Sequence, residues 1–395
     1  MSSIQEIYDG LCFTCVFRGV LDRPVFKSFL EYCEIPKSNP SAKRKAYAQF
    51  VSVIYSQGNG SLTELVHREI FENENAYVKA AGKGERADAN MERSTKRELA
   101  VFSQFAALGY EAFAADMGAS EEEIPAFRSA ERALGSVYQK RVREIGKHGY
   151  GIFASYGMFR LSDEREIEPI ASADKISTDS FVGYEAERDR VMANTRAFVE
   201  GRPAANALLC GDAGTGKSST VKAVANAFFD EGVRLIEIRK DQLKHLPFIM
   251  SKIVDNPLKF IIFIDDLSFN KSDDNFSMLK AALEGSASAK ADNAVIYATS
   301  NRRHIIKESF GDRDGDDVHR NDTLQETLSL SERFGLVVLY SKPNKQLYLE
   351  IVHELAKRKG ITEGLDLLDI QAEAFALRKG NRSARCAQQF IDSLL

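Results

Sequence analysis

The chain has few cysteines, no long uninterrupted apolar run and no strong excess of charge of either sign. Its 395 residues include 53 Lys and Arg and 57 Asp and Glu, which gives a formal net charge of -4. This balance provides no global attraction for nucleic acid or an anionic membrane, so any such attraction needs a local basic patch. No apolar run is long enough to cross a bilayer, and we expect no membrane partner. The first ten residues contain acidic side chains and no apolar core, which predicts no signal peptide and a cytoplasmic location.

The five cysteines are an odd number in a long chain, which argues against a disulfide framework. Cys12 and Cys15 have the spacing of a zinc or redox pair, and only Cys33 lies near them as a third candidate ligand. A structural zinc site needs four nitrogen or sulfur ligands. The ligand shortage favours the alternative, in which Cys12 and Cys15 are small apolar residues one helical turn apart and face the core.

Residues 1–147 have the patterns of an N-terminal, mostly α-helical domain, which we expect to bind a client or partner. Apolar residues at helical spacing over 62–80 and 99–117 indicate helices, and Ser61 is placed to cap the first of them. Three basic clusters lie in this domain, at residues 43–45, 93–97 and 140–143. Solvated helix faces are the favoured interpretation of these clusters, and a surface for nucleic acid or a partner is the alternative.

The pattern changes along the second half of the chain. Residues 148–176 are first rich in glycine and aromatic residues and then alternate and become acidic, which predicts a hairpin or linker. From residue 177 predicted strands alternate with helices, as in an α/β fold with a parallel sheet between helices. The five predicted strands are 207–210, 234–238, 260–265, 294–299 and 336–340. We expect the sheet domain to cover 177–341 and a small helical lid to cover 342–395.

Residues 211–218 match the complete P-loop pattern G-x-x-x-x-G-K-[ST], between an apolar strand and a helical pattern. Its glycines let successive backbone N–H groups point at phosphate oxygens, and the helix N-terminus adds its positive end. Lys217 is expected to bridge the β- and γ-phosphates of ATP, and Ser218 to bind Mg²⁺. The candidate phosphate-binding residues are Gly211, Asp212, Ala213, Gly214, Thr215, Gly216, Lys217, Ser218 and Ser219.

A second motif follows a strand that is apolar over residues 260–264, as a strand buried on both faces should be. Asp265 and Asp266 come directly after it, and two adjacent carboxylates repel each other unless one faces a metal ion. We expect Asp265 to hold Mg²⁺, directly or through water, and Asp266 to orient or deprotonate the attacking water. The alternative, two exposed loop aspartates, is disfavoured by the P-loop upstream.

Together these residues resemble the AAA+ superfamily of P-loop ATPases, and specifically a bacterial family of uncharacterised AAA+ ATP-binding proteins related to helicase loaders of the DnaC type. The resemblance covers about residues 176–395. It implies that residues 179–184 cup the adenine, with Val182 and Gly183 among the nucleotide-binding residues. It also implies that Asn301, just past a strand, orients the lytic water as the sensor-1 residue.

Residues 328–335, Leu-Ser-Leu-Ser-Glu-Arg-Phe-Gly, are similar to the AAA+ motif that carries the arginine finger. By this resemblance Arg333 reaches the γ-phosphate bound by the neighbouring subunit, where a planar guanidinium can donate two hydrogen bonds. The alternative is a surface salt bridge of Arg333 with Glu332 or Glu326.

In the lid, residues 380–385 resemble the sensor-2 stretch, with Arg385 preferred and Arg382 as the alternative.

One position departs from the family pattern, since most hydrolysing AAA+ proteins have glutamate where this chain has Asp266. The aspartate side chain is one methylene shorter and needs a displaced water or a closer strand. This departure predicts slow turnover and leaves nucleotide binding unaffected.

The sequence therefore predicts an AAA+ ATPase that hydrolyses ATP to ADP and phosphate. We expect a homo-oligomer, a hexamer or an open helix, that remodels or loads an unknown protein client. A slow nucleotide switch or interaction module is one alternative. A DNA-associated ATPase of the helicase-loader type is another, which the near-neutral net charge disfavours. A P-loop metabolic kinase would have no use for the sensor-like strand end, the finger-like motif and the lid together.

Overall fold

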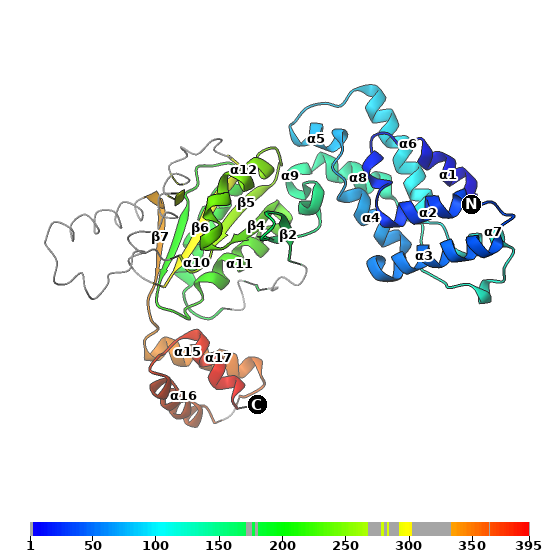
Figure 1. The fold of residues 1–395 in the computed structure, drawn as a ribbon. Helices are drawn as coiled ribbons and strands as arrows, with labels where there is room; N and C mark the ends of the chain where they lie inside the picture. The colour runs from blue at the N-terminus through cyan, green and yellow to red at the C-terminus, as the bar shows by residue number, and fades with distance from the viewer. Residues whose placement is uncertain are drawn as a thin grey trace. The chain divides into compact units, whose positions relative to one another are not determined.

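The computed structural model forms two compact units (Figure 1). Unit 1 comprises Met1–Ser155 with Asp255–Pro257, and unit 2 comprises Tyr156–Val254 with Leu258–Leu395. Residues 3–170, 176–177, 181–267, 278–279, 283, 292–301, 333–362 and 364–394 are described. The first unit thus continues eight residues beyond the predicted domain limit at residue 147.

Unit 1 consists of helices. Its helices are α1 (Ile4–Cys12), α2 (Pro24–Glu34), α3 (Pro40–Gly58), α4 (Leu62–Phe71), α5 (Ala76–Gly82), α6 (Ala89–Ala106), α7 (Tyr110–Met117), α8 (Leu134–Arg143) and α9 (Ile145–His148). Ser61 caps α4 as predicted, because its side chain accepts a hydrogen bond from the backbone N–H of Glu64.

Two predicted helices of unit 1 were wrong in extent. The range 62–80 contains both α4 and α5, because Asn75 leaves the helical conformation and caps the second helix through the N–H of Val78. The range 99–117 contains the end of α6 and the whole of α7, which are separated at Gly109. Apolar residues at helical spacing lie on both sides of each break, so their spacing alone did not reveal the breaks.

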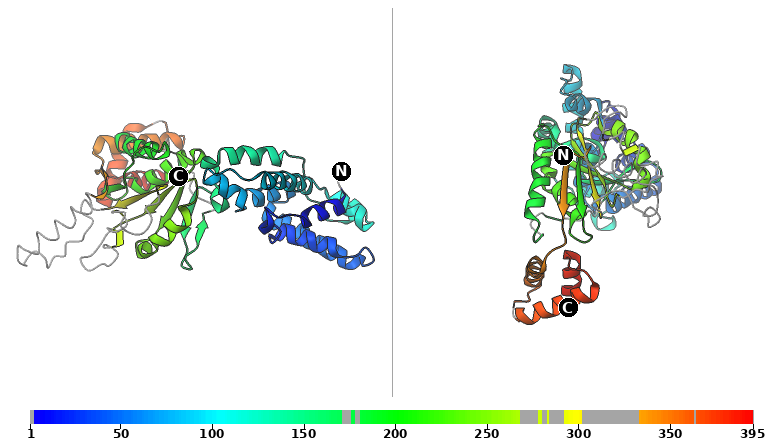
Figure 2. Two further views of the ribbon diagram at one scale, coloured as in Figure 1. Left: turned by 90° about the horizontal axis from the view of Figure 1, so that it is seen from above. Right: turned by 90° about the vertical axis from the view of Figure 1, so that its left-hand side faces the viewer.

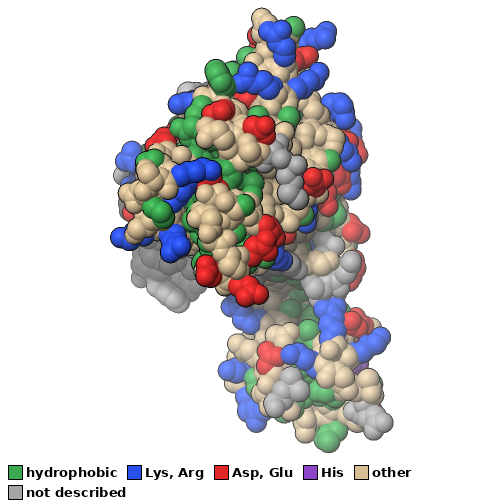
Figure 3. Space-filling model, turned by 90° about the vertical axis from the view of Figure 1, so that its right-hand side faces the viewer, with side chains coloured by type: hydrophobic (Ala, Val, Ile, Leu, Met, Phe, Trp, Pro, Cys, Tyr) green, Lys and Arg blue, Asp and Glu red, His purple; other side chains and the backbone are tan. Residues whose placement is uncertain are grey.

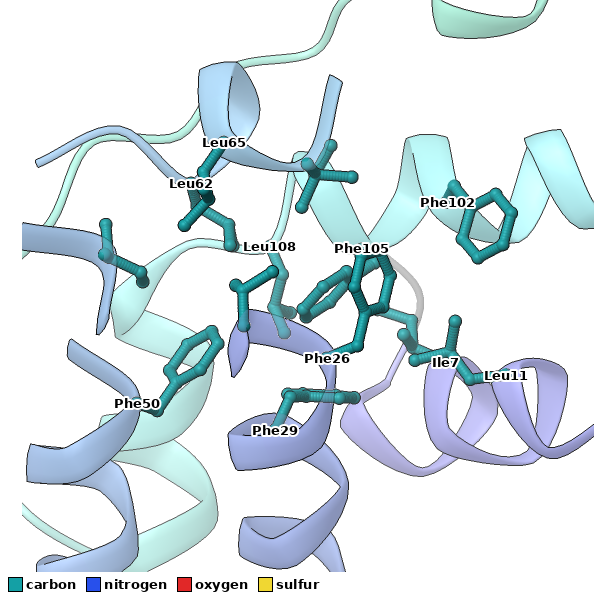
Figure 4. Close-up of a cluster of buried hydrophobic side chains, with 14 of the residues drawn as sticks. Ile7, Leu11, Phe26, Phe29, Phe50, Leu62, Leu65, Phe102, Phe105 and Leu108 are labelled. Carbon is teal, nitrogen blue, oxygen red and sulfur yellow. The ribbon is translucent and has the colours of Figure 1, made fainter. Parts of the chain in front are cut away.

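The core of unit 1 is a cluster of aromatic and aliphatic side chains (Figure 4). Phe26 and Phe29 of α2 pack on Phe105 of α6 with ring centroids 5.1 and 4.6 Å apart. Ile7 and Leu11 place one face of α1 in the same cluster. The C-terminal end of α1 is thereby fixed beside α6.

The prediction that Cys12 and Cys15 face the core was wrong, since both are exposed. Cys15 lies beyond the end of α1, and its thiol donates a hydrogen bond to Oε1 of Glu98 at 3.0 Å. That hydrogen bond raises the pKa of the Cys15 thiol. Among the described residues, no group of three or more His, Cys, Asp or Glu side chains could hold a metal ion.

Unit 2 contains a seven-stranded sheet in the order β2-β1-β4-β5-β6-β3-β7. Its strands are β1 (Met158–Leu161), β2 (Ile167–Pro169), β3 (Ala207–Gly211), β4 (Val233–Ile238), β5 (Lys259–Ile264), β6 (Ala294–Ser300) and β7 (Leu336–Tyr340). The five predicted strands are present and pair in parallel, which confirms the α/β class.

The sheet has two strands more than the five predicted. Residues 158–169 form the expected hairpin, but its first strand, β1, pairs in parallel with β4, and β2 forms the sheet edge. The hairpin therefore extends the sheet of unit 2.

Helices cover both faces of the sheet. Cluster residues of α10 (Glu185–Val199) and α11 (Lys217–Ala227) pack on alternate strand residues such as Leu209, Leu235 and Ile261. Helix α12 (Leu246–Ile253) lies on the opposite face (Figures 1 and 2). The lid contains α15 (Lys345–Arg358), α16 (Leu365–Lys379) and α17 (Ala384–Asp392) around a small core of its own. Among all described helices, none combines the length and apolar character that a membrane span requires.

Candidate nucleotide-binding site

The P-loop connects β3 to α11 at the carboxyl edge of the sheet, where ligands bind in open α/β folds. Gly211 has φ 131°, and a Cβ at this position would lie 2.0 Å from the backbone oxygen of Tyr340. Gly216 has φ 92° and directly precedes α11. At Gly211, only glycine allows both the positive φ and the close approach of the Tyr340 carbonyl on β7. The approach of β7 therefore requires glycine at the first P-loop position.

Lys217 is 5% exposed and lies at the start of α11. Its Nζ donates to the backbone oxygens of Gly211 and Asp212 at 3.1 and 2.7 Å and to Oδ1 of Asn301 at 3.0 Å. Burial lowers the pKa of this ammonium. The lysine is held inside the loop, where it can exchange carbonyl partners for phosphate oxygens.

Asp265 directly follows β5 and collects three donors on its Oδ1 atom. The hydroxyl of Ser218 donates to it at 2.6 Å and the hydroxyl of Thr299 at 2.5 Å. The backbone N–H of Asp266 is 3.1 Å from the same oxygen. Ser218 and Thr299 are distant from Asp265 in the sequence, and the pairing of β5, β6 and β3 brings them to it.

Asp266 has a left-handed backbone, with φ 53°. Its N–H also donates to Oγ1 of Thr299 at 3.0 Å, and its Oδ1 accepts from Nδ2 of Asn301 at 2.8 Å. Because Asn301 also contacts Lys217, its amide connects the P-loop lysine to the second aspartate. Aspartate is one of the few non-glycine residues that adopt this backbone conformation readily.

The oxygen atoms of Ser218 and Asp265 suit Mg²⁺. This ion prefers oxygen ligands and is usually held by one or two carboxylates together with substrate phosphates. The two side chains already lie within hydrogen-bond distance of each other, so one ion can replace the proton between them. The predicted metal pair therefore fits the ion.

A cavity of about 240 Å³ lies beside the P-loop, between core and lid residues of unit 2. Val182 and Gly183 line it together with P-loop residues Gly214, Thr215, Gly216 and Ser219. Apolar side chains of α15, Ile351 and Leu355, form the lid side. Gly183 has φ 74°, and a Cβ there would lie 2.5 Å from Cδ1 of Leu347, so the chain passes close against the lid. Residues 179 and 180 of the predicted adenine segment lie outside the described residues.

The two lid arginines have different surroundings. Arg382 forms a bidentate ion pair with Glu373, with Nε–Oε1 and Nη2–Oε2 distances of 3.0 and 2.7 Å. Arg385 lines the cavity, and its backbone nitrogen lies 3.4 Å from the backbone oxygen of Gly214. This geometry favours Arg385 as the lid arginine that faces a nucleotide.

Arg333 is half-buried and lies three residues before the start of β7. It does not line the cavity beside the P-loop of its own chain. Residues 302–332, which include most of the finger-like motif and the possible partners Glu326 and Glu332, lie outside the part of the chain that is described. The role of Arg333 therefore stays a prediction.

Sequence reasoning missed several residues of the site, among them Thr299, Tyr340 and Arg188. Thr299 contacts both aspartates, and its signal was its place near the end of β6, two residues before Asn301. Tyr340 and Arg188 line the cavity. Burial raises the pKa of Tyr340 to about 12, and its hydroxyl donates to Thr220 of α11. No local motif marks these two residues.

Replacing Thr299 by valine tests the arrangement around Asp265. We expect the Mg²⁺ concentration that supports half-maximal ATP hydrolysis to rise by about tenfold or more, as when other outer-shell metal partners are lost. Thr195→Val is the matched control, since Thr195 is equally buried and bonds Tyr297 away from the site. Equal Mg²⁺ dependence of the two variants would contradict this role of Thr299.

Comparison with known proteins gives one family match. A family model described as "Protein of unknown function (DUF815)" matches residues 154–395. No curated protein matches the chain. The Thermotoga maritima RuvB Holliday junction branch migration motor matches at 14% identity and TM-score 0.32, over 55% of this chain and 72% of that one. A mutant of the same motor matches at 13% identity and TM-score 0.35, over the same shares of the two chains.

Proposed function

Because the chain belongs to the family described as "Protein of unknown function (DUF815)", whose description gives no activity, we propose a function from its own site: it binds ATP and hydrolyses it to ADP and phosphate. The observation that carries this proposal is the convergence of Lys217, Asp265 and Asn301 at the ends of three adjacent strands, β3, β5 and β6. A cavity for the rest of a nucleotide adjoins them.

Each side chain has a distinct task in the proposed reaction. Lys217 leaves its carbonyl partners and contacts the β- and γ-phosphates, while Arg385 approaches from the lid. Ser218 and Asp265 hold Mg²⁺, which when bound neutralises charge on the phosphate oxygens. Asn301 and Asp266 orient a water molecule toward the γ-phosphorus, and Asp266 accepts its proton as the bond to ADP breaks.

We further propose that the active form is a homo-oligomer in which Arg333 serves the site of a neighbouring subunit. Two observations support this. Arg333 lies outside the cavity of its own chain. The lid also exposes an apolar stripe on α16, where Leu367, Ile370 and Leu377 are 59%, 67% and 72% exposed. Burial of such side chains against another copy stabilises an assembly by about 25 cal/mol per Å² of apolar surface.

The first experiment is a measurement of ATPase rate against protein concentration, with light scattering on the same samples with and without ATP. The proposal predicts that specific activity rises with concentration and that ATP promotes assembly. A monomer with constant specific activity at all concentrations would contradict the shared site, and a chain that binds no ATP would contradict the whole proposal. Coupling of this activity to the remodelling or loading of a macromolecular client, through unit 1, is part of the same proposal.

A slow nucleotide switch is the second candidate function. It is favoured by the short side chain of Asp266 and by its hydrogen bond to Asn301, which holds the carboxylate in place. If the switch proposal is right, Asp266→Glu raises the turnover number, by about tenfold, the gain expected of a better-placed general base. The measurement is steady-state phosphate release at saturating ATP, with Asp241→Glu as a surface control. Rapid hydrolysis by the wild type and no gain in the variant would exclude the switch.

A further inference from the structure

Phe13 is an exposed aromatic residue on the loop that follows α1. Its side chain is 71% exposed, although the loop lies against the well-packed part of unit 1 where α1 meets α6. A single exposed apolar side chain needs no explanation in itself. Phe13 differs from such residues because side chains of α6 contact both its loop and its ring.

Glu98 of α6 binds the backbone of this loop. Glu98 is only 1% exposed, and its carboxylate accepts hydrogen bonds from three successive backbone N–H groups, those of Cys15, Val16 and Phe17, at 2.9 to 3.1 Å. A buried carboxylate is costly without such donors, and charge-assisted hydrogen bonds are the stronger kind. The loop is therefore tied to α6, and Phe13 is presented from a fixed backbone.

Arg97, the residue before Glu98, holds Phe13 from the other side. Its guanidinium lies 5.4 Å from the centroid of the Phe13 ring, and its Nη2 donates to the Phe13 backbone oxygen at 3.2 Å. A cation at this distance from an aromatic ring is attracted to it. One face of the ring is thus occupied by Arg97, and most of the side chain stays open to solvent.

Two further cations extend this surface along α6. Arg93 precedes Arg97 by one helical turn and lies on the same face, and Lys96 is adjacent. All three are exposed, and no carboxylate of the described residues lies within salt-bridge distance of them. In the space-filling view, Lys and Arg side chains gather at the level of the N-terminal end of α6 (Figure 3).

We propose that Phe13, Arg93, Lys96 and Arg97 form a binding surface for single-stranded nucleic acid. The uncompensated cations favour a polyanion, and the open ring offers a stacking platform for an unpaired base. A duplex keeps its bases stacked and cannot use the ring, and an acidic peptide would use the cations alone. This surface is independent of the proposed ATP site, since all four residues lie in unit 1.

The test uses the full-length chain and fluorescence anisotropy with a labelled 20-nucleotide oligo-dT strand. A mixed-sequence duplex and a labelled polyglutamate peptide are the comparison probes. The single strand is expected to bind most tightly, and Phe13→Ala to weaken its binding by about tenfold, within the range for loss of one stacked base. Tyr55→Ala, which removes another exposed ring of unit 1, should leave binding unchanged.

A double variant, Arg93→Gln with Lys96→Gln, should reduce the slope of log K against log salt concentration by about 1.4, or about 0.7 for each lost phosphate contact. Arg44→Gln with Lys45→Gln, on exposed positions of α3, is its control. Thermal denaturation and ATPase rate verify that the variants are folded. Unchanged binding by Phe13→Ala would overturn the proposal. An equal reduction of the salt-dependence slope in the two double variants would also overturn it. Preference for polyglutamate would replace it with a surface for an acidic protein.

Discussion

Replacement of Lys217 by alanine is expected to weaken ATP binding by about 100-fold or more. The lysine ammonium donates to three acceptors, two carbonyl oxygens of the loop and the side-chain oxygen of Asn301, and the phosphates would replace the two carbonyls. A 100-fold loss corresponds to about 2.7 kcal/mol, within the range for removal of one charged hydrogen-bonding group. Titration of a fluorescent ATP analogue, with Mg²⁺ present, measures the effect.

Lys222→Ala is the matched control for this prediction. Lys222 lies on the same helix, α11, and forms a 3.0 Å ion pair with Glu237, away from the cavity. Its removal should leave the dissociation constant unchanged. Because loss of buried Lys217 also removes packing, Lys217→Met retains the apolar stem and separates binding from stability. Wild-type affinity in a folded Lys217→Met protein would contradict the assignment of the P-loop.

Replacement of Arg333 by alanine is expected to lower ATP turnover by about 1,000-fold or more while ATP binding stays within about twofold. This is the size of effect that arginine fingers have on phosphoryl transfer, because the guanidinium stabilises charge that develops only in the transition state. Arg202→Ala is the control, since Arg202 is an exposed arginine that pairs with Glu200. A comparable loss of ATP turnover in both variants would indicate that Arg333 has only a structural role, as one partner of an ion pair.

A mixing experiment then decides whether Arg333 acts across a subunit boundary. Neither Lys217→Ala nor Arg333→Ala protein should hydrolyse ATP alone. In a mixture, an intact pocket of the Arg333→Ala chain can lie beside an intact arginine of the Lys217→Ala chain. Turnover should therefore return to a measurable fraction of the wild-type rate. Mixtures that stay inactive, although light scattering shows mixed oligomers, would contradict the shared site.

The α/β class, the five predicted parallel strands and the P-loop followed from the sequence because each depends on contiguous residues. A run such as 260–264 is apolar throughout, as a strand buried on both faces requires. The eight P-loop residues specify their own backbone path between a strand and a helix. Local chemistry is sufficient for both, so the strand positions deviated from the prediction by no more than about a residue or two.

Only the tertiary structure decided which distant groups meet. Thr299 reaches Asp265 because β5 and β6 pair in one register, and a shift of one residue would turn its hydroxyl to the other face of the sheet. The hairpin at 158–169 joins the sheet because β4 offers it an edge, which nothing within the hairpin specifies. Likewise, Cys15 turned away from the core because Glu98, 83 residues later, binds its backbone. Contacts of this kind depend on the packing of whole elements, and a pattern of neighbouring residues does not encode them.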